Sequence, residues 1–283
     1  MGTYVITGSA SGMGRKTAER LRDAGHTVIG VDITSAEVVA DLSTPTGRTK
    51  AACDVLDASG GRLDGAVLAA GLGPAPGPDR PRRIVAVNYL GVVELLDAWR
   101  PALAAAERAK VVVFSSNSTT TVPAVPGRAV TALLAGDADR AVRAVRWFGK
   151  NASVMTYAAS KIAVSRWVRR NAVSPQWAGA GIRLNALAPG AVMTPLLQQQ
   201  LADPREARQV RRFPIPIGGF GDPGHLAEWA CFMLSDAADF LCGSVVFVDG
   251  GSDAYFRADD WPAPLPAHRL VSFLKRFRGY RGA

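Results

Sequence analysis

The sequence predicts an α/β protein built on one seven-stranded parallel sheet with helices on both faces. Short, almost uninterrupted apolar runs alternate with longer helix-forming stretches, as expected for strands that are buried on both faces. A glycine-rich turn joins the first apolar run to the first helical stretch. Apolar residues make up 48% of the 283 residues and charged residues 20%, so the chain can bury a large core and is not disordered.

The first half of the chain is expected to supply four strands. Residues 3–7 form a β-rich run that ends at a glycine, and the helix formers of 14–23 follow it, with Gly25 suited to the helix end. The apolar run 27–33 predicts a second buried strand, with almost no helix between it and the third. The remaining elements of this half are a third strand at 37–42, a helix at 45–58 and a fourth strand at 63–70.

The second half is expected to supply three more strands. A long helical stretch over residues 82–106 leads to the fifth strand, 110–115, which is almost wholly apolar. The later elements alternate in the same way, with helices at 157–177 and 224–234 and strands at 181–188 and 244–249. Because a helical stretch separates most successive strands, the sheet is expected to be parallel. We expect one domain over residues 1–253 and a basic C-terminal extension over 254–283.

The turn after the first strand has the sequence TGSASGMG, residues 7–14. Its glycines allow the backbone to turn tightly and approach a pyrophosphate, which the N-terminus of the next helix would bind. Asp32 lies eighteen residues after Gly14, where its carboxylate can accept hydrogen bonds from both adenosine ribose hydroxyls. It would repel a 2′-phosphate, and Ser11 and Ile33 supply no positive charge. We therefore expect a Rossmann-type, doubly wound domain that binds NAD rather than NADP.

Tyr157 and Lys161 are four residues apart, so on a helix they share one face. A phenol with a pKa of about 10 is a poor acid or base at neutral pH. A neighbouring ammonium, together with the positive nicotinamide, favours the phenolate and lowers that pKa. The pair is therefore suited to proton exchange with an alcohol or ketone oxygen.

Taken together, these motifs resemble those of the short-chain dehydrogenase/reductase family over about residues 3–251. The matching segments are TGSASGMG at 7–14, Asp32, LAAG at 68–71, VNYLG at 87–91, VFSS at 113–116, YAASK at 157–161, RLNALAPG at 183–190 and VDGG at 248–251. The resemblance implies an oxidoreductase that moves a hydride between a nicotinamide cofactor and a carbonyl carbon.

The resemblance also implies a catalytic set of four residues. Tyr157 would be the general acid and base, and Lys161 would hold the nicotinamide ribose and lower the tyrosine pKa. Ser116 would hydrogen-bond the reacting oxygen; Ser115 competes for that role, but the family's serine is usually the last of the pair that closes the fifth strand. Asn88 would hold a water that links Lys161 to solvent, or would only pack its helix.

The family's cofactor contacts are carried over in the same way. Val192 and Thr194, in the loop after Pro189, would bind the nicotinamide carboxamide. The family's usual Asn-Asn-Ala-Gly is here Leu-Ala-Ala-Gly, residues 68–71, so bracing by asparagine side chains is lost. The expected contacts are Gly8, Ser11, Gly12, Met13, Gly14, Asp32, Ile33, Asp41, Leu42, Ala70, Gly71, Tyr157, Lys161, Pro189, Val192 and Thr194.

Two segments compete for the family's adenine-binding Asp-Val pair. Asp54 and Val55 have the usual residue types but fall on an expected helix, whereas Asp41 and Leu42 end the third strand. We therefore favour Asp41 and Leu42.

Ser116 and Tyr157 are 41 residues apart, whereas family members usually separate them by about a dozen. The surplus, about residues 117–153, lies between two catalytic residues and must border the active site. Its apolar content suggests a lid over a bulky apolar substrate, with packing or assembly as the alternative. With ADLST at 40–44 and LAAGLGP at 68–74, the insertion most resembles the 3α-hydroxysteroid dehydrogenase/carbonyl reductase branch.

We therefore expect an NAD-dependent enzyme that interconverts a secondary alcohol and a ketone, most simply a hydroxysteroid. A carbonyl reductase for other cyclic or aromatic ketones and a nucleotide-sensing binding protein on the same fold are the alternatives. A homodimer is favoured over a tetramer, because the insertion would obstruct the helical interface that includes the Tyr-Lys helix. The remaining interface would use the last helix and the last strand.

The net charge of +9 does not indicate a nucleic-acid partner, because the six Lys and Arg and two Asp of residues 254–283 give that segment +4. Within it, residues 270–278 could form a short basic amphipathic helix, for which packing on the protein or a partner subunit is favoured over a membrane. Cys53, Cys231 and Cys242 have no metal-binding spacing and are expected to be buried thiols of a cytoplasmic protein. No signal peptide or spanning segment is expected, and no metal site.

Overall fold

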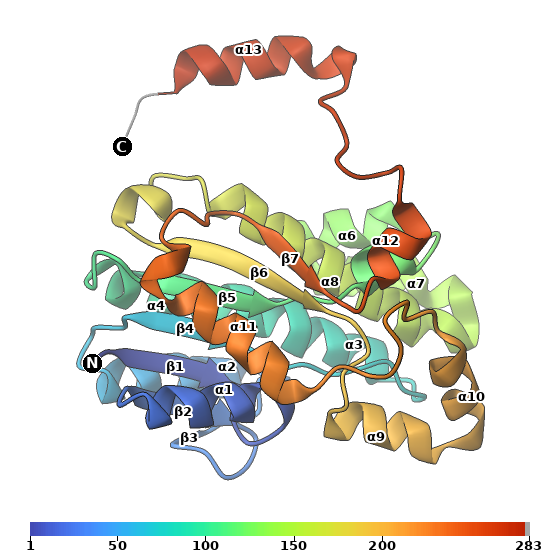
Figure 1. The fold of residues 1–283 in the computed structure, drawn as a ribbon, viewed down its shortest axis with the longest axis horizontal. Helices are drawn as coiled ribbons and strands as arrows, with labels where there is room; N and C mark the ends of the chain where they lie inside the picture. The colour runs from blue at the N-terminus through green and yellow to red at the C-terminus, as the bar shows by residue number, and fades with distance from the viewer. Residues whose placement is uncertain (281–283) are drawn as a thin grey trace.

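A computed structural model describes residues 1–280 of the chain and shows a seven-stranded sheet (Figure 1). The strand order is β3-β2-β1-β4-β5-β6-β7, and every neighbouring pair is parallel. The strands are β1 Thr3–Thr7, β2 Thr27–Asp32, β3 Val38–Val39, β4 Gly65–Leu68, β5 Lys110–Phe114, β6 Arg183–Pro189 and β7 Val245–Val248. The order reverses direction at β1, so the expected doubly wound sheet is confirmed.

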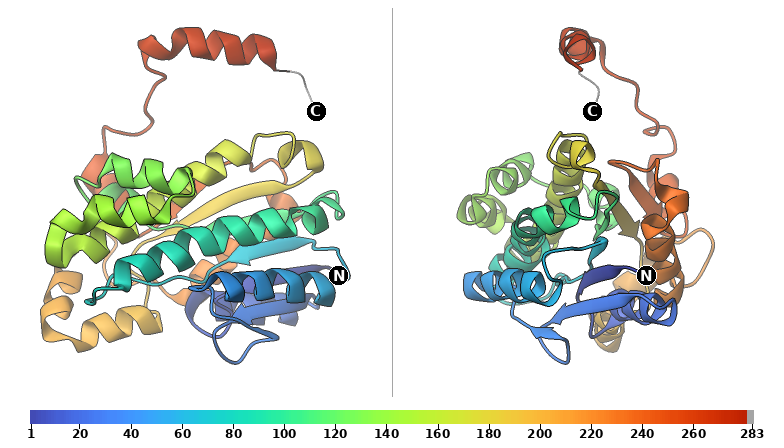
Figure 2. Two further views of the ribbon diagram at one scale, coloured as in Figure 1. Left: turned by 180° about the vertical axis from the view of Figure 1, so that it is seen from behind. Right: turned by 90° about the vertical axis from the view of Figure 1, so that its left-hand side faces the viewer.

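Helices cover both faces of the sheet. On one face α1 (Gly12–Asp23) packs against α11 (Pro223–Leu234), in front of the sheet in Figure 1. On the other face, seen in the left view of Figure 2, lie α2 (Pro45–Ala58), α4 (Gly91–Ala104) and α8 (Ala152–Asn171). The short helix α3 (Arg80–Val85) passes through a π-helical turn, η1 (Ala86–Leu90), into α4.

Each face has its own apolar core. Ile6, Val67 and Val112 point to the α1–α11 side, whereas Val5 and Ala66 point to the α4–α8 side. This alternation along a strand is the reason that the strand sequences are continuously apolar. Trp99 and Trp177 are among the largest fully buried side chains, and the burial of each such side chain stabilises the fold by about 2 kcal/mol.

The 117–153 insertion forms helices that pack on the outside of α8. These are α5 (Ser118–Thr121), α6 (Gly127–Leu134) and α7 (Ala138–Val145), followed by a 3₁₀ stretch, η2 (Arg146–Asn151). Val130 and Leu133 of α6 are buried in the same core cluster as Ala159 and Ala163 of α8. Helix α7 also contacts α3, with Arg82 2.7 Å from Asp139 (Figure 1). The insertion is therefore an integral part of this face of the core.

Several expected boundaries differ from the structure. The Tyr-Lys helix was expected over 157–177, but α8 begins five residues earlier and ends at Asn171. Pro175 lacks the N–H that a continuing helix needs, so the chain turns before Trp177. Two helices after β6 were not expected, α9 (Pro195–Ala202) and α10 (Pro204–Arg212). Each begins with a proline, which interrupts the helical pattern in the sequence but suits a first helical position.

The C-terminal extension leaves the body of the protein (Figures 1 and 2). After α12 (Ser252–Arg257) and a short 3₁₀ turn, η5 (Ala267–Arg269), helix α13 (Leu270–Gly279) stands apart from the sheet and its helices. Every residue from 258 to 280 is exposed, so the expected helix is present but packing on the protein's own surface is wrong. Residues 281–283 of the predicted extension lie outside the described residues.

Two further expectations can be compared with the structure. Within residues 1–280, no helix is long and apolar enough to cross a bilayer. All three cysteines are free thiols, but the expectation that they are buried is wrong: Cys53 is exposed, and Cys231 and Cys242 are only partly buried. Cys53 lies on the outer side of α2, whose buried residues Ala51 and Val55 face the core.

Candidate active site

The glycine turn after β1 is shaped by contacts that leave no room for side chains. A Cβ atom added at Gly8 would lie 2.7 Å from the amide nitrogen of Ala70, and one at Gly14 would lie 2.2 Å from the carbonyl oxygen of Gly8. Gly8 and Gly12 also have positive φ angles of 72° and 54°, which other residues adopt only with strain. The turn therefore brings bare backbone to the N-terminus of α1.

A cleft of about 240 Å³ opens beside this turn, at the carboxyl ends of β1, β2 and β4. This is the edge at which open α/β sheets bind their ligands. Twelve of the sixteen expected cofactor contacts line the cleft: Gly8, Ser11, Gly12, Met13, Gly14, Asp32, Ile33, Asp41, Leu42, Ala70, Gly71 and Thr194. Neither Asp54 nor Val55 does; both lie on α2.

Asp32 ends β2 with its carboxylate held by backbone donors. Oδ2 accepts a hydrogen bond from the Ala10 amide at 2.9 Å, and Oδ1 accepts one from the Ile33 amide at 2.7 Å. Each carboxylate oxygen can accept a second hydrogen bond, so the oriented carboxylate can still receive two hydroxyl groups. No ion pair with Asp32 occurs in the described part of the chain, so its charge stays uncompensated.

Asp41 also lines the cleft, next to a cation that sequence reasoning missed. The amide and side chain of Ser43 donate to the Asp41 carboxylate and hold its pKa below the usual range, and the nearby charge of Arg83 lowers it further. Arg83 lies on α3 and lines the same cleft. Its position comes from the packing of α3 over the sheet edge, and its sequence neighbourhood carries no motif that marks it.

A second cavity, of about 390 Å³, adjoins the first and contains the expected catalytic residues. Met13, Gly71, Leu72, Thr194 and Leu196 line both. Ser116 enters it from the end of β5, and Tyr157 and Lys161 enter it from α8. The nicotinamide-loop residues Pro189 and Val192 line it as well. A ligand that spans the two cavities would therefore pass from Asp32 to Tyr157.

Tyr157 and Lys161 lie in a desolvated setting. Burial raises the pKa of the Tyr157 phenol, and a hydrogen bond with the Ser116 side chain lowers it in part. Burial lowers the pKa of Lys161 to about 8. The Lys161 Nζ donates to the carbonyl oxygen of Phe114 at 2.7 Å and lies 5.9 Å from the centre of the Tyr157 ring. The expected lowering of the tyrosine pKa by Lys161 is not found in the protein by itself, because desolvation dominates at this distance.

The two candidate serines have different surroundings. The Ser115 Oγ lies 2.6 Å from the Ser165 Oγ and 3.4 Å from the carbonyl oxygen of Lys161, so its hydroxyl is directed at α8. The Ser116 Oγ accepts a hydrogen bond from the Ser118 amide at 3.1 Å and shares a hydrogen bond with Tyr157. These contacts favour Ser116 over Ser115 as the partner of the tyrosine.

Asn88 is fully buried in the π-helical turn η1 and lines neither cavity. Its Oδ1 accepts from the Leu72 amide at 2.8 Å, and its Nδ2 donates to the Leu72 carbonyl oxygen at 2.9 Å. A Cβ added at Gly71 would lie 3.6 Å from this Oδ1 and 3.9 Å from the Lys161 Nζ. Asn88 therefore fixes the loop after β4 close to Lys161, and its role in holding a relay water stays a prediction.

The cover of the second cavity differs from the expected lid. Of the insertion, Asn117, Ser118, Thr121 and Val122 line the cavity, whereas the lining includes no residue of α6 or α7. Most of the cover comes from α9, α10 and the segment just after them, and its residues are Leu196, Leu197, Gln200, Gln209, Val210 and Phe213. The insertion thus borders the site as expected but is not its main lid. The amphipathic stretch after Thr194 was the signal that could have identified the cover.

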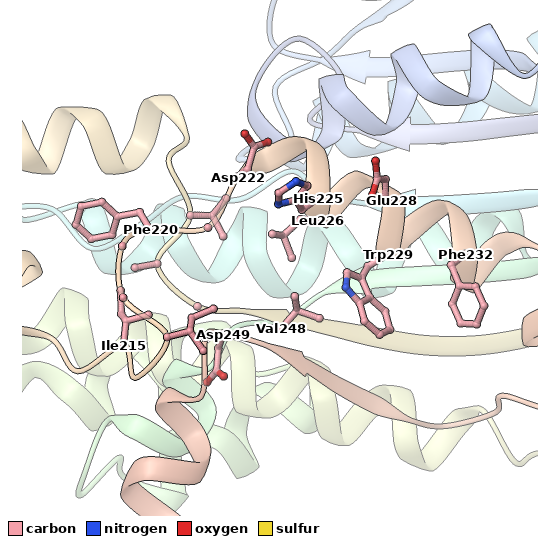
Figure 3. A pocket seen from close by; sticks show the side chains of 18 residues that line it. Ile215, Phe220, Asp222, His225, Leu226, Glu228, Trp229, Phe232, Val248 and Asp249 are labelled. Carbon is pink, nitrogen blue, oxygen red and sulfur yellow. The ribbon is translucent and has the colours of Figure 1, made fainter.

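A third and larger cavity, of about 720 Å³, lies between α11, the ends of β6 and β7 and residues 215–221 (Figure 3), and Gly190, Ala191 and Val192 line both it and the second cavity. Figure 3 shows Trp229 and Phe232 on the α11 side of the cavity. Its carboxylates already have partners in the protein: Asp222 accepts from the Gly224 amide, Glu228 pairs with Arg20, and Asp249 accepts from the Asp253 amide. It contains none of the expected catalytic residues.

The sequence matches known proteins over most of its length. A family model described as short chain dehydrogenase matches residues 3–128, and one described as Enoyl-(Acyl carrier protein) reductase matches residues 140–253. The 3-alpha-hydroxysteroid dehydrogenase/carbonyl reductase of Comamonas testosteroni is 40% identical over 257 residues, which cover 91% of this chain and 98% of that protein. The chain belongs to the short chain dehydrogenase family. Its expected family, fold and enzyme class, an oxidoreductase, are thereby confirmed.

Other members of the family show how far the similarity extends. A crystal structure of the 3-alpha-hydroxysteroid dehydrogenase from Pseudomonas sp. B-0831, complexed with NADH, has a TM-score of 0.85 and 46% identity, with 92% of this chain and 100% of that chain covered. The Cis-4-hydroxycyclohexanecarboxylate dehydrogenase of Sinomonas cyclohexanicum is 30% identical over 275 residues, which cover 88% of this chain and 96% of that protein. Both similarities cover the sheet and the catalytic segments rather than one motif.

Proposed function

We propose that this protein is an NAD-dependent hydroxysteroid dehydrogenase/carbonyl reductase. The observation that carries the proposal is the adjacency of two cavities, one with an uncompensated carboxylate at Asp32 and the other apolar with Tyr157 and Ser116 in it. The relatives with 40% and 46% identity, named for 3-alpha-hydroxysteroids, support the steroid as substrate class. A substrate with a secondary alcohol or ketone group on a bulky apolar skeleton matches the apolar cavity that contains Tyr157 and Ser116.

The first cavity fits NAD(H). Gly8 and Gly14 let the turn, the loop after β4 and the start of α1 pack so closely that a Cβ would clash, and this tight turn would present the N-terminus of α1 to a pyrophosphate. Asp32 would receive the adenosine ribose hydroxyls, Asp41 and Leu42 would border the adenine, and Val192 and Thr194 would border the nicotinamide. When bound, NAD(H) supplies or accepts the hydride.

Tyr157 moves the proton in this proposal. At neutral pH its raised pKa keeps the phenol protonated, so it can donate its proton to a ketone oxygen during reduction. Oxidation of the alcohol needs the phenolate, which a positive nicotinamide and the Lys161 ammonium favour. Because the Ser118 amide donates to the Ser116 Oγ, the Ser116 hydroxyl hydrogen is left to bond the reacting oxygen or the tyrosine.

The second cavity fits a bulky apolar substrate with few polar groups. Its volume of about 390 Å³ lies in the range of small-molecule sites. Ser118 lines it, and the Ser118 Oγ is buried without a hydrogen-bond partner in residues 1–280. Gln200 and Gln209 offer further polar contacts in the cover.

Turnover of a ketone panel tests the substrate class. With NADH, at least one of the 3-keto, 17-keto and 20-keto steroids is expected to have a kcat/KM about tenfold or more above that of simple aryl ketones, because the larger skeleton buries more apolar area in the cavity. Steady-state loss of NADH absorbance measures it. A higher kcat/KM for the aryl ketones than for every steroid would favour a carbonyl reductase for smaller cyclic or aromatic ketones instead.

The protein is further proposed to be a homodimer that works in the cytoplasm. The α6–α8 packing covers part of the α8 surface that a second helical interface would use. Next to β6, against which α8 packs, β7 is an edge strand with one unpaired side, and Trp229 and Phe232 of α11 are exposed. An unpaired edge beside exposed aromatic residues is suited to pairing with a second copy.

Light scattering after size-exclusion chromatography tests the dimer. The parent protein is expected to have the mass of two chains, because the β7–α11 edge is the surface proposed for assembly. A paired substitution, Trp229→Glu with Phe232→Glu, is expected to shift the mass toward one chain, because it places charges in an apolar contact. A parent mass near four chains would contradict the proposal, as would an unchanged dimer in the double variant.

A further inference from the structure

Helix α13 is the last helix of the described residues and is exposed along its whole length. All ten of its residues are exposed, and the rings of Phe273 and Phe277 stack with their centres 6.2 Å apart. An extended segment with three prolines in six residues, Trp261 to Pro266, connects it to the body and prevents a continuous helix from α12. Five large apolar side chains are exposed on this one short helix, which marks it as a binding surface.

The residues of α13 are divided between two faces. Leu270, Phe273, Leu274 and Phe277 recur at intervals of three and four residues, so they form one apolar stripe. Lys275 and Arg276 lie on the opposite side, and Arg269 and Arg278 lie at the two ends. A basic polar face with a Leu- and Phe-rich apolar face is the pattern of helices that lie in the plane of a lipid interface.

The charge around α13 indicates an anionic occupant. Residues 261–280 contain four Arg and Lys residues and no Asp or Glu. Residues 1–253 are themselves basic, with a net charge of +5. A second copy of this chain would therefore meet the helix with charge of the same sign, whereas anionic headgroups attract each Lys or Arg near the surface.

The large cavity beside β7 is an apolar site that a second copy could offer to α13. Its acidic residues are Asp222, Glu228 and Asp249. Glu228 pairs with Arg20, whereas Asp222 and Asp249 accept hydrogen bonds from amides and form no ion pair in the described part of the chain. Binding α13 there would still bring together two chains of net positive charge, whereas an anionic lipid surface attracts the cations of α13. The net charge therefore favours a lipid surface over a subunit contact.

We propose that α13 binds the surface of anionic lipid membranes, with its apolar stripe between the headgroups and its cations on the phosphates. Trp261 at the start of the linker and Tyr280 after the helix add aromatic side chains, which are suited to the interface between water and acyl chains. The Pro-rich segment then holds the catalytic body at the membrane without inserting it. This surface attachment is separate from the oxidoreductase site and does not depend on its substrate.

Vesicle sedimentation of the full-length protein tests the proposal. The probes are phosphatidylcholine vesicles with and without 30% phosphatidylglycerol, at low and at physiological salt. The protein is expected to sediment with the anionic vesicles only, and less so as salt screens the charges. Lys275→Glu with Arg276→Glu is expected to weaken binding by about 30-fold or more, given the attraction of each cation to the surface.

Two further variants separate a membrane contact from other roles. Phe273→Ser with Phe277→Ser is expected to abolish binding, because it removes half of the apolar stripe. Arg143→Glu with Lys150→Glu, a matched charge reversal at exposed positions outside α13, is expected to leave binding unchanged. Ketone turnover in solution is expected to be the same in all of these variants, which shows that the body is folded.

Three results would overturn the proposal. One is equal sedimentation with neutral and anionic vesicles, or none with either. Another is loss of binding in the Arg143 and Lys150 variant to the same extent as in the α13 charge variant. The third is a change in mass by light scattering, without a change in vesicle binding, when α13 is altered; that result would make α13 a subunit contact.

Discussion

Replacement of Tyr157 by phenylalanine is expected to lower kcat by about 10³-fold or more while NADH binding stays within about twofold of the parent. The variant loses only the phenolic oxygen, the group proposed to give or take the proton of the reacting oxygen. The ring remains, so the wall of the cavity keeps its shape. Steady-state turnover and fluorescence titration with NADH measure the two quantities separately.

The matched controls for this variant are the substitution of another tyrosine and the substitution of each of the two candidate serines. Tyr4→Phe removes a phenol at the opposite end of β1 and is expected to leave turnover unchanged. Ser116→Ala is expected to lower kcat, because its hydroxyl contacts Tyr157, whereas Ser115→Ala should retain most of it, because that hydroxyl bonds Ser165. Turnover of Tyr157→Phe above a tenth of the parent value would rule out Tyr157 as the proton donor.

Replacement of Asp32 by alanine is expected to weaken NADH binding by about 10- to 100-fold, the loss that follows when hydrogen bonds to a charged group are removed. NADPH binding is expected to weaken much less or to improve, because the variant no longer repels the 2′-phosphate. The ratio of the two dissociation constants, from fluorescence titration, is the quantity to measure.

Two other substitutions make this test specific. Asp32→Asn keeps an acceptor for the Ile33 amide but removes the charge. It is therefore expected to be more stable than Asp32→Ala while it still relaxes the preference for NADH. Asp54→Ala removes a carboxylate on α2 that lies outside the cleft and pairs with Lys50, and it is expected to change neither constant. A parent protein that binds NADPH as tightly as NADH would contradict the role of Asp32.

The parts of the site that the sequence predicted are those that short segments determine. The glycine turn, Asp32 at the end of β2 and the spacing of Tyr157 and Lys161 depend on residues that are close in the chain. The choice of Asp41 and Leu42 over Asp54 and Val55 also depended on local pattern alone, and the cleft contains the chosen pair. The sheet followed from continuous apolar runs, because strands covered on both faces need them.

The parts that were missed depend on contacts between distant segments. Arg83 reaches the cleft only because α3 lies over the sheet edge, and the cover by α9 and α10 depends on how two proline-started helices fold back over the cavity. The pKa of Tyr157 also differed from the expected direction because of contacts between distant segments. Its direction is set by burial among residues from β5, β6 and α8, and no spacing along the chain reports burial. The packing of the insertion on α8 was likewise a matter of tertiary structure.

Label transfer from NADH to a 3-keto steroid tests the central claim most directly. NADH carrying deuterium at both C4 positions is incubated with the protein and the ketone, and the alcohol is analysed by mass spectrometry. An alcohol that is one mass unit heavier, with deuterium on the carbinol carbon and faster formation than with equally labelled NADPH, is the expected result. An unlabelled alcohol, formation with NADPH alone, or no alcohol from any ketone of the panel would contradict the account.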